Sequence, residues 1–209
     1  MKKFLLADDH HVVRSGLGLI IKEEFSDAEI DECSNGSCVW RKVQSTEYDL
    51  VILDITMPAT DSVRLLEKIL TYKPGQKLMI FTISSEAIYA KKYLAMGVKG
   101  FINKEAEPSA IRLGIAAILS NKKYLGPDMK HILTWGGKNN EASTPFDNLT
   151  IRELEIMNHL VDGKNVSEIA RMYSLHISTI STHKANIMAK LDVSNAVELT
   201  KMVQQFNNK

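Results

Sequence analysis

The stretch Phe4-Leu5-Leu6-Ala7-Asp8-Asp9 sets four apolar residues directly before two carboxylates, and Leu50-Val51-Ile52-Leu53-Asp54 sets four before one. Short apolar runs of this kind are typical of strands buried on both faces of a parallel sheet. Further runs lie at 30–33, 78–82 and 100–102, with amphipathic helical patterns near 12–24, 36–45, 61–70, 86–96 and 108–120. The sequence therefore predicts an α/β fold with a doubly wound, five-stranded parallel sheet.

A change of composition divides the chain into two predicted domains. Residues 135–145 are rich in Gly, Asn, Ser and Pro, which is the composition of a flexible connection, and 127–133 is compatible with a short helix. Four helical patterns follow without any strand pattern, at about 150–161, 165–173, 178–191 and 195–206. We predict a first domain over 1–121, a linker over 122–145 and a small all-α domain over 146–209.

Composition excludes several classes of protein. The 209 residues are 44% hydrophobic and 24% charged with a net charge of +1, so the chain is globular and any basic surface must be local. Cys33 and Cys38 lack the further ligands of a zinc site, and we expect both to be reduced thiols. The first apolar run ends at Asp8, too early for a signal peptide or a membrane span. We expect a cytoplasmic protein without a membrane partner.

The carboxylates at the strand ends predict a metal-assisted phosphoryl site. Neighbouring parallel strands would bring Asp8, Asp9 and Asp54 to one edge of the sheet, where they repel one another unless a cation joins them. Mg²⁺ suits such oxygen ligands, and one carboxylate can then act as a nucleophile toward phosphorus. Thr82 ends the fourth strand and Lys104 follows the fifth, so a hydroxyl and an ammonium are available for phosphoryl oxygens.

This set of residues resembles the signature of response-regulator receiver domains, which have a flavodoxin-like fold. The resemblance covers residues 1 to about 120 and rests on Asp8-Asp9, Asp54 with Met57-Pro58, Thr82 and Phe101-Ile102-Asn103-Lys104. It implies that Asp54 is the phosphoacceptor and that Mg²⁺ is bound by Asp9 directly, by Asp8 mainly through water, by Asp54 and by the Thr56 backbone carbonyl. It also implies that Thr82 and Lys104 bind the phosphoryl group and that Thr82 and Phe101 form the switch.

Two positions depart from the common receiver pattern. The loop after Pro58 reads Ala59-Thr60-Asp61-Ser62 where many receivers carry glycines, and a residue with a side chain resists positive φ there. Phe101 lacks the hydroxyl that a tyrosine would offer.

Capping residues and helical spacing define the second domain. Thr150 with Glu153 predicts a capping box on its first helix, Ser167 or Asn165 caps the second, and Ser178 caps the third. The apolar side chains expected to point inward are Ile169, Leu175, Ile180, Ile187 and Leu191. A tight turn before a capped, outwardly polar helix is the geometry of a helix placed in a DNA major groove.

The segment resembles the LuxR-type helix-turn-helix, and with the receiver the chain is similar to response regulators of the NarL/FixJ class. The resemblance rests on Leu149-Thr150-x-Arg152-Glu153, Glu168-Ile169-Ala170, Thr179-Ile180, His183, Asn186-Ile187 and Lys190-Leu191. It implies that bases face Ser181, Thr182 and Ala185 and that the DNA backbone faces Lys184 and Lys190. The predicted DNA-binding surface is Thr179, Ser181, Thr182, Lys184, Ala185 and Lys190.

The resemblance implies a DNA-binding transcription regulator controlled by phosphorylation. A sensor histidine kinase would donate the phosphoryl group to Asp54, and the partners would be promoter DNA, with RNA polymerase a candidate, and a second copy in an active homodimer. The chain would not be an enzyme, because it promotes only its own phosphorylation and dephosphorylation. Apolar residues on the last helix would pack on their own domain, on a second subunit, or on both.

Two alternatives come from other classes. A phosphatase of the haloacid-dehalogenase type needs a second aspartate two residues after the nucleophile, where this chain has Thr56, and it needs an inserted cap that is absent here. A receiver that signals through protein contacts alone is disfavoured by the helix-turn-helix pattern.

Overall fold

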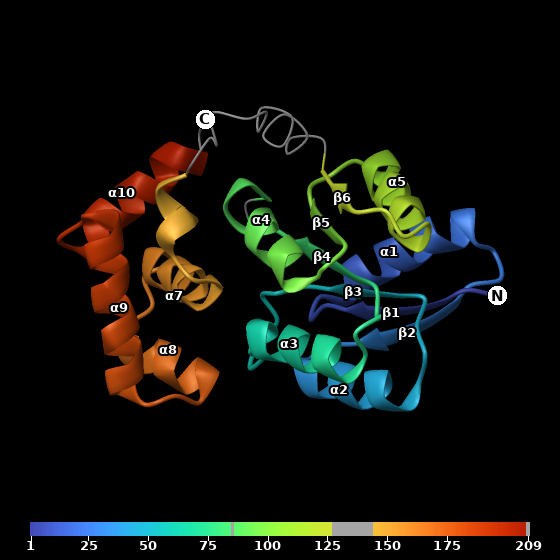
Figure 1. Ribbon diagram of the computed structural model, residues 1–209, viewed down its shortest axis with the longest axis horizontal. Helices are drawn as coiled ribbons and strands as arrows, with labels where there is room; N and C mark the ends of the chain where they lie inside the picture. Colours follow the sequence, from blue (N-terminus) through green and yellow to red (C-terminus); the bar gives the residue numbers. More distant parts are fainter. Residues whose placement is uncertain (85, 127–143, 208–209) are drawn as a thin grey trace. The chain divides into compact units, whose positions relative to one another are not determined.

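The computed structural model describes residues 1–84, 86–126 and 144–207 (Figure 1). The chain forms two compact units, 1–141 and 142–209. The short helix expected at 127–133 and most of the expected linker lie outside the described residues. Within the described ranges, no helix is both long enough and apolar enough to cross a bilayer.

The first unit is built on a parallel sheet with strand order β2-β1-β3-β4-β5-β6. The strands are β1 Lys3–Ala7, β2 Glu29–Cys33, β3 Leu50–Leu53, β4 Leu78–Thr82, β5 Gly100–Asn103 and β6 Tyr124–Leu125. The doubly wound parallel sheet is confirmed, with one strand more than predicted. The two residues of β6 pair with β5 and lie inside the range assigned to the linker. Their sequence is too short to carry a strand pattern of its own.

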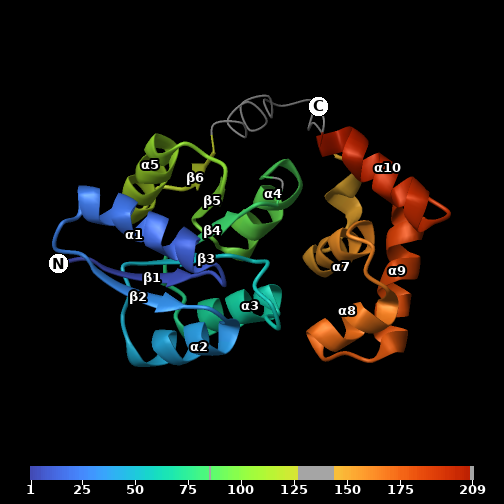
Figure 2. The ribbon, with the colours of Figure 1, turned by 180° about the vertical axis from the view of Figure 1, so that it is seen from behind.

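Helices cover both faces of this sheet. They are α1 His11–Glu24, α2 Gly36–Ser45, α3 Ser62–Tyr72, α4 Glu86–Met96 and α5 Pro108–Leu119. Helices α1 and α5 pack together on one face, and α2 and α3 on the other (Figures 1 and 2). The core on the α1 and α5 side joins Phe4 and Ile52 of the sheet to Ile21 and Ile115 of the helices. Burial of these apolar side chains supplies the main favourable free energy of folding.

The expectation of reduced thiols is wrong in this structure, because Cys33 and Cys38 form a disulfide. Cys33 ends β2, and Cys38 lies in the first turn of α2. The sharp turn between them brings their Cα atoms to 5.6 Å, within the range that a disulfide spans. The sequence separation of five residues gave no indication of this turn geometry.

The second unit is all-α, as predicted. A 3-10 turn at Pro145–Asn148 precedes α7 Ile151–Val161, α8 Val166–Tyr173, α9 Ile177–Leu191 and α10 Ala196–Asn207. The capping box on α7 joins Thr150 and Glu153, and the open choice for α8 is decided in favour of Asn165, which pairs with Glu168.

Two details of the second unit were predicted wrongly. Helix α9 begins at Ile177, so its cap is His176 rather than the expected Ser178. Leu175 is 38% exposed instead of pointing inward, because it lies in the turn after Ser174, which has a positive φ of 53°. Residues Leu199 and Val203 of α10 are buried, and the Phe206 ring meets Phe146 edge-on at 5.3 Å, so the last helix packs on its own unit.

Two helical glycines test how tightly the first unit is packed. A methyl group on Gly114 of α5 would lie 2.4 Å from Ile102 Cδ1 and 3.0 Å from the Tyr124 ring, whereas one on Gly16 of α1 would meet nothing within 4 Å. We expect Gly114→Ala to lower the free energy of unfolding by about 1–3 kcal/mol through overpacking. We expect Gly16→Ala to raise it by about 0.5–1 kcal/mol, because alanine favours the helix. Urea denaturation of both variants measures the free energies of unfolding. Equal values for the two variants would show that Gly114 of α5 is not tightly packed against β6.

A half-buried histidine makes the stability of the second unit depend on pH. His159 Nε2 lies 3.2 Å from the Tyr173 hydroxyl, and its Nδ1 lies 3.1 Å from the Lys164 ammonium. Burial and then the charge of Lys164 hold the pKa of His159 below its ordinary value of 6.5, although Asp162 acts in the opposite direction. The folded state therefore favours the neutral ring.

Because the pKa of His159 is lowered on folding, its contribution to stability is present above about pH 6.5 and is lost as the pH falls toward the folded-state pKa. We expect the free energy of unfolding to fall between pH 7 and pH 5, and to fall less steeply in His159→Gln. Denaturant titrations at several pH values measure both slopes. Identical slopes would mean that the histidine protonates equally well in the folded and unfolded states.

Candidate functional site

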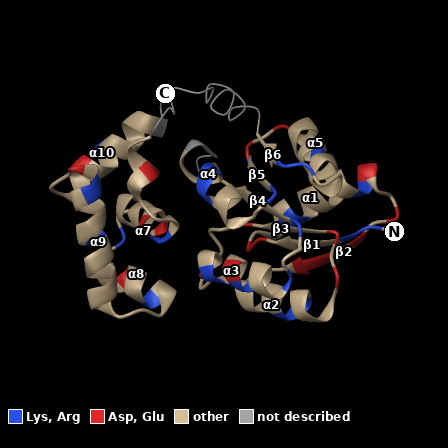
Figure 3. Ribbon diagram, viewed as in Figure 1, with Lys and Arg blue, Asp and Glu red and all other residues tan. Residues whose placement is uncertain are grey.

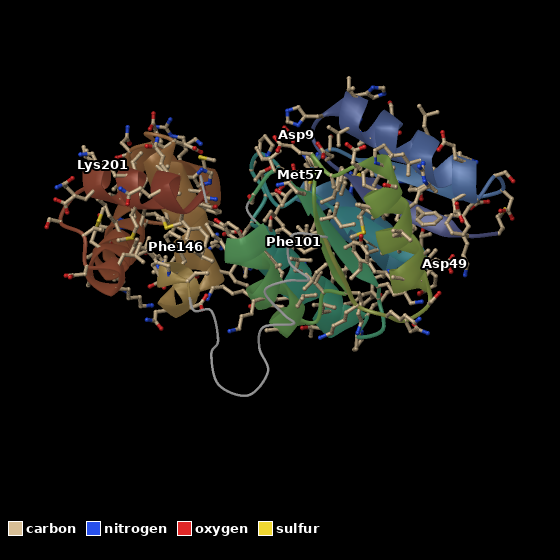
Figure 4. All side chains as sticks on the ribbon, turned by 90° about the horizontal axis from the view of Figure 1, so that it is seen from above. Asp9, Asp49, Met57, Phe101, Phe146 and Lys201 are labelled. Carbon is tan, nitrogen blue, oxygen red and sulfur yellow. A yellow bond between two sulfur atoms is a disulfide. The ribbon has the colours of Figure 1, made fainter. Side chains whose placement is uncertain are left out.

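The order of the strands brings the predicted phosphoryl site together. Strand β1 pairs with β3 so that Ala7 lies opposite Leu53, and Asp8 and Asp54 therefore leave the sheet side by side. The Asp54 amide also donates to the Ala7 carbonyl at 2.8 Å. Figure 4 labels Asp9 and Met57, which follow these two strands, at the same end of the first unit.

Lys104 joins the two buried carboxylates. Its ammonium donates a hydrogen bond to Asp54 Oδ2 at 2.7 Å. It also lies 2.6 Å from Asp8 Oδ2, in an ion pair whose angles do not meet those of a hydrogen bond. Burial alone would lower the pKa of Lys104, but the hydrogen bond to Asp54 and the contact with Asp8 outweigh it, so the pKa is raised. Lys104 is therefore a fixed positive charge at the site.

Asp54 is held from its other side by Thr56. The Thr56 amide donates to Asp54 Oδ1 at 2.9 Å, and its hydroxyl lies 2.8 Å from both carboxylate oxygens. The carboxylate of Asp54 thus has fixed donors on two sides, which orients it at the end of β3.

Thr82 lies at the end of β4, next to β3, and is fully buried. Its hydroxyl contacts the amide of Ser84 at 3.4 Å and the hydroxyl of Ser84 at 3.5 Å. The Lys104 amide donates to the Thr82 carbonyl at 3.0 Å, so the last residue of β4 and the first residue after β5 are fixed to each other.

His10 is a member of this cluster that the sequence analysis did not include. Its amide donates to Asp8 Oδ1 at 2.9 Å, and its Nδ1 lies 3.3 Å from Asp8 Oδ1 and 3.2 Å from Asp9 Oδ1. Its place directly after two acidic residues was the available signal. The turn that starts α1 brings the imidazole back toward the carboxylates.

The donor atoms suit a divalent cation. One ligand atom each from Asp8, Asp9 and His10 can lie within 4.8 Å of the others. Asp54 stands beside this group but is linked to Asp8 through Lys104. Carboxylate oxygens near a buried strand end are the ligands that hard cations prefer, so these residues fit Mg²⁺.

Phe101 is buried in a row of aromatic rings. It is fully buried on β5, its ring centroid lies 6.0 Å from that of Tyr93 on α4, and Tyr93 in turn lies 6.3 Å from Tyr89. The row connects the strand that precedes Lys104 to the helix that follows Thr82. A displacement at the end of β5 would therefore reach α4 through side chains that are in contact with one another.

The loop after Asp54 does adopt the conformation that its sequence was expected to resist. Ala59 has a φ of 52°, in the left-handed region. A residue with a side chain costs roughly 1–2 kcal/mol there relative to glycine. Thr60 then accepts a hydrogen bond from the Gly36 amide at 3.0 Å and donates one to the Pro58 carbonyl at 3.2 Å. These contacts hold the loop against its backbone strain.

The second unit presents most of the predicted DNA-binding surface. Of the residues predicted to form that surface, Lys184 is partly exposed, and the others are exposed: Thr179, Ser181, Thr182, Ala185 and Lys190. The charged residues of α9 are lysines only (Figure 3). The Ser181 and Thr182 hydroxyls donate to carbonyls one turn earlier and keep lone pairs free to accept.

Lys190 has a partner inside its own unit. Its ammonium lies 3.0 and 2.7 Å from the two carboxylate oxygens of Glu153, which is 3% exposed. Burial would raise the pKa of Glu153, but the hydrogen bonds from Lys190 and Thr150 outweigh it and hold the pKa below its ordinary value. The two lysines predicted to face the DNA backbone are therefore not equivalent.

Comparisons with known proteins agree with this architecture. A model of the response regulator receiver domain matches residues 4–116, and a model of the LuxR family of bacterial regulatory proteins matches residues 147–203. The oxygen regulatory protein NreC of Staphylococcus haemolyticus is 30% identical over 206 residues, covering 94% of each chain. The response regulator UvrY of Escherichia coli is 27% identical over 201 residues, covering 96% of this chain and 92% of UvrY.

A solved structure supports the fold. RcsB of Salmonella enterica serovar Typhimurium, bound to promoter P1flhDC in the presence of phosphomimetic BeF3⁻, matches with a TM-score of 0.77 at 21% identity, covering 98% of both chains. The matched family models, the relatives and the geometry of both units agree. The chain belongs to the response regulators of the NarL/FixJ class, in which a receiver domain precedes a LuxR-type DNA-binding domain.

Proposed function

We propose that the chain is a cytoplasmic transcription regulator whose binding to promoter DNA is set by phosphorylation of Asp54. The observation that carries the proposal is the Asp54 carboxylate at the end of β3, oriented by Thr56 and joined to Asp8 by the Lys104 ammonium. We take the receiver as residues 1–121, the connection as 122–145 and the DNA-binding domain as 146–209.

The phosphoryl step uses groups already in place. An Asp54 oxygen attacks the phosphorus of a phosphohistidine on a sensor kinase, a P–O bond forms, and the P–N bond breaks toward the kinase imidazole. Asp8, Asp9, Asp54 and the Thr56 carbonyl would hold Mg²⁺, which neutralises negative charge on the transferring group. The chain acts only on its own aspartate, by acquiring and later losing the phosphoryl group.

The switch follows from the new charge. A phosphoryl group on Asp54 adds negative charge and acceptor oxygens beside Lys104 and Thr82, both of which can donate to it. Movement of Thr82 and of the strand that carries Phe101 would shift α4 through the aromatic row. We propose that this favours a homodimer able to bind DNA.

The DNA contacts are proposed for the exposed face of α9. Thr179, Ser181, Thr182 and Ala185 offer small polar or methyl groups to base edges, and Lys184 offers a charge to phosphate. RcsB was solved as two dimers bound to two parallel DNAs, which supports a dimeric DNA complex for a protein of this fold. RNA polymerase is a further candidate partner at the promoter.

Replacing the phosphoacceptor tests the input. We expect Asp54→Asn to abolish labelling by acetyl phosphate with Mg²⁺, because the amide cannot form the acyl phosphate. A phosphate-affinity gel measures the labelled fraction. The matched control that keeps labelling is Asp61→Asn, at the partly exposed N-cap of α3, where asparagine also serves as a cap. Full labelling of Asp54→Asn would refute the site.

The two lysines of α9 test the output. We expect Lys184→Ala to weaken DNA binding and to reduce the slope of log affinity against log salt by about 0.9, the value for one lost phosphate contact. We expect Lys190→Ala to leave that slope nearly unchanged and to lower the free energy of unfolding by about 1–2 kcal/mol, because it removes the cation that neutralises the buried Glu153 carboxylate.

Fluorescence anisotropy at several salt concentrations measures the slopes, and urea denaturation measures the stabilities. If Lys190→Ala reduced the salt slope and Lys184→Ala did not, the DNA backbone would instead contact the carboxyl end of α9.

A further inference from the structure

The Cys33–Cys38 disulfide bridges the turn between β2 and α2. Cys33 is 3% exposed, at the end of the strand that pairs with β1, while Cys38 is partly exposed on the first turn of α2. The two sulfurs therefore differ in their access to reagents in solution. Cys38 is therefore the expected point of attack for a small nucleophile.

Residues at the end of β2 fix both the amide and the carbonyl of Asp8. The Asp8 amide donates to the Cys33 carbonyl at 3.1 Å. The Asp8 carbonyl accepts from Arg14 at 2.7 Å, and the same guanidinium is fixed by Glu32, the neighbour of Cys33, at 2.6 Å. The position of the Asp8 carboxylate therefore depends on the last two residues of β2.

The same turn also touches the loop after Asp54. Gly36, between the two cysteines, donates its amide to the Thr60 hydroxyl at 3.0 Å. A methyl group on Gly36 would lie 2.6 Å from the Thr60 side chain, so the turn and the loop are in close contact. The bridged turn thus contacts both loops that carry the acidic residues of the phosphorylation site.

We propose that the Cys33–Cys38 pair is a thiol–disulfide exchange site for small cellular thiols and that its reduction slows phosphorylation of Asp54. A thiolate attacks the Cys38 sulfur, forming a mixed disulfide and releasing Cys33 as a thiolate that takes a proton. A second thiol displaces Cys38, so that two small thiols are oxidised to their disulfide while the protein disulfide is reduced to two thiols. The reverse exchange restores the bridge.

The cellular setting of the proposed function favours exchange over a permanent bridge. Persistent disulfides are rare in the cytosol of most organisms, and those found there are usually transient or redox-sensing. Disulfides that are exposed to solvent are also the ones that tend to be labile or regulatory, and Cys38 is partly exposed here.

The direction of the effect follows from the hydrogen bonds. Reduction removes the cross-link that fixes the first turn of α2 to the end of β2. The Cys33 carbonyl and the Gly36 amide then hold Asp8 and Thr60 less firmly, so the carboxylates are less well placed for Mg²⁺ and for the incoming phosphoryl group. This coupling rests on the proposed function, whereas the exchange chemistry does not.

The first measurement tests exchange alone. Full-length protein is equilibrated in glutathione buffers of graded reduced-to-oxidised ratio, and free cysteines are counted by alkylation and mass spectrometry. We expect a reversible change between no alkylated cysteine and two, with a glutathione adduct trapped on Cys38. Two free thiols under every oxidising ratio, or a bridge that no ratio reduces, would overturn the exchange site.

The second measurement tests the coupling. The rate of Asp54 labelling by acetyl phosphate and the affinity for Mg²⁺ by calorimetry are compared between the oxidised and reduced wild-type protein. We expect the reduced form to be labelled about fivefold more slowly, the size expected for weakening one backbone hydrogen bond, with weaker Mg²⁺ binding.

Variants without the bridge serve as matched controls. Cys38→Ser should behave as the reduced wild-type protein and should not respond to glutathione, and Ser37→Ala, which leaves both cysteines, should respond as the wild-type protein does. Equal labelling rates in the two redox forms would overturn the coupling. Absence of labelling in every form would refute the proposed function while leaving the alkylation result intact.

Discussion

The first unit depends on one electrostatic arrangement, in which the Lys104 ammonium lies between the buried carboxylates of Asp54 and Asp8. Buried charges are costly unless they are paired, so two carboxylates at one sheet edge need a cation within hydrogen-bonding distance. The lysine reaches them because β5 ends at the same edge of the sheet as β3, with only β4 between them. The edge of the sheet and the site are therefore fixed by the same contacts.

This arrangement explains how a charge change at Asp54 can reach the rest of the receiver. A phosphoryl group on Asp54 would replace the Asp54 carboxylate with a new anion that competes with Asp8 for the same ammonium. The Lys104 amide also donates to the Thr82 carbonyl. The strand before Lys104 carries Phe101 into the ring row of α4. Phe101, which contacts the helix proposed to move, is thus separated from Lys104 at the site only by Ile102 and Asn103.

Much of the fold and the acidic site could be predicted because their signals are local. The apolar runs before Asp8 and Asp54 identify central strands, and the parallel order then places the carboxylates at one edge. The capping box at Thr150 is a similar local signal. The remaining features depend on contacts between distant segments. The pairing of β6, the salt bridge between Lys190 and Glu153, and the turn that joins the cysteines have no periodic pattern in the sequence.

The carboxylate of Glu153 has two tasks in the second unit: it caps the start of α7 and it binds the carboxyl end of α9 through Lys190. The helix proposed to enter the groove is thereby fixed by its last turn, away from Ser181 and Ala185. Residues on its outer face can then change without loosening the support beneath them. If that face reads DNA as proposed, substitution of a few surface side chains would be enough to change the sequence that is bound.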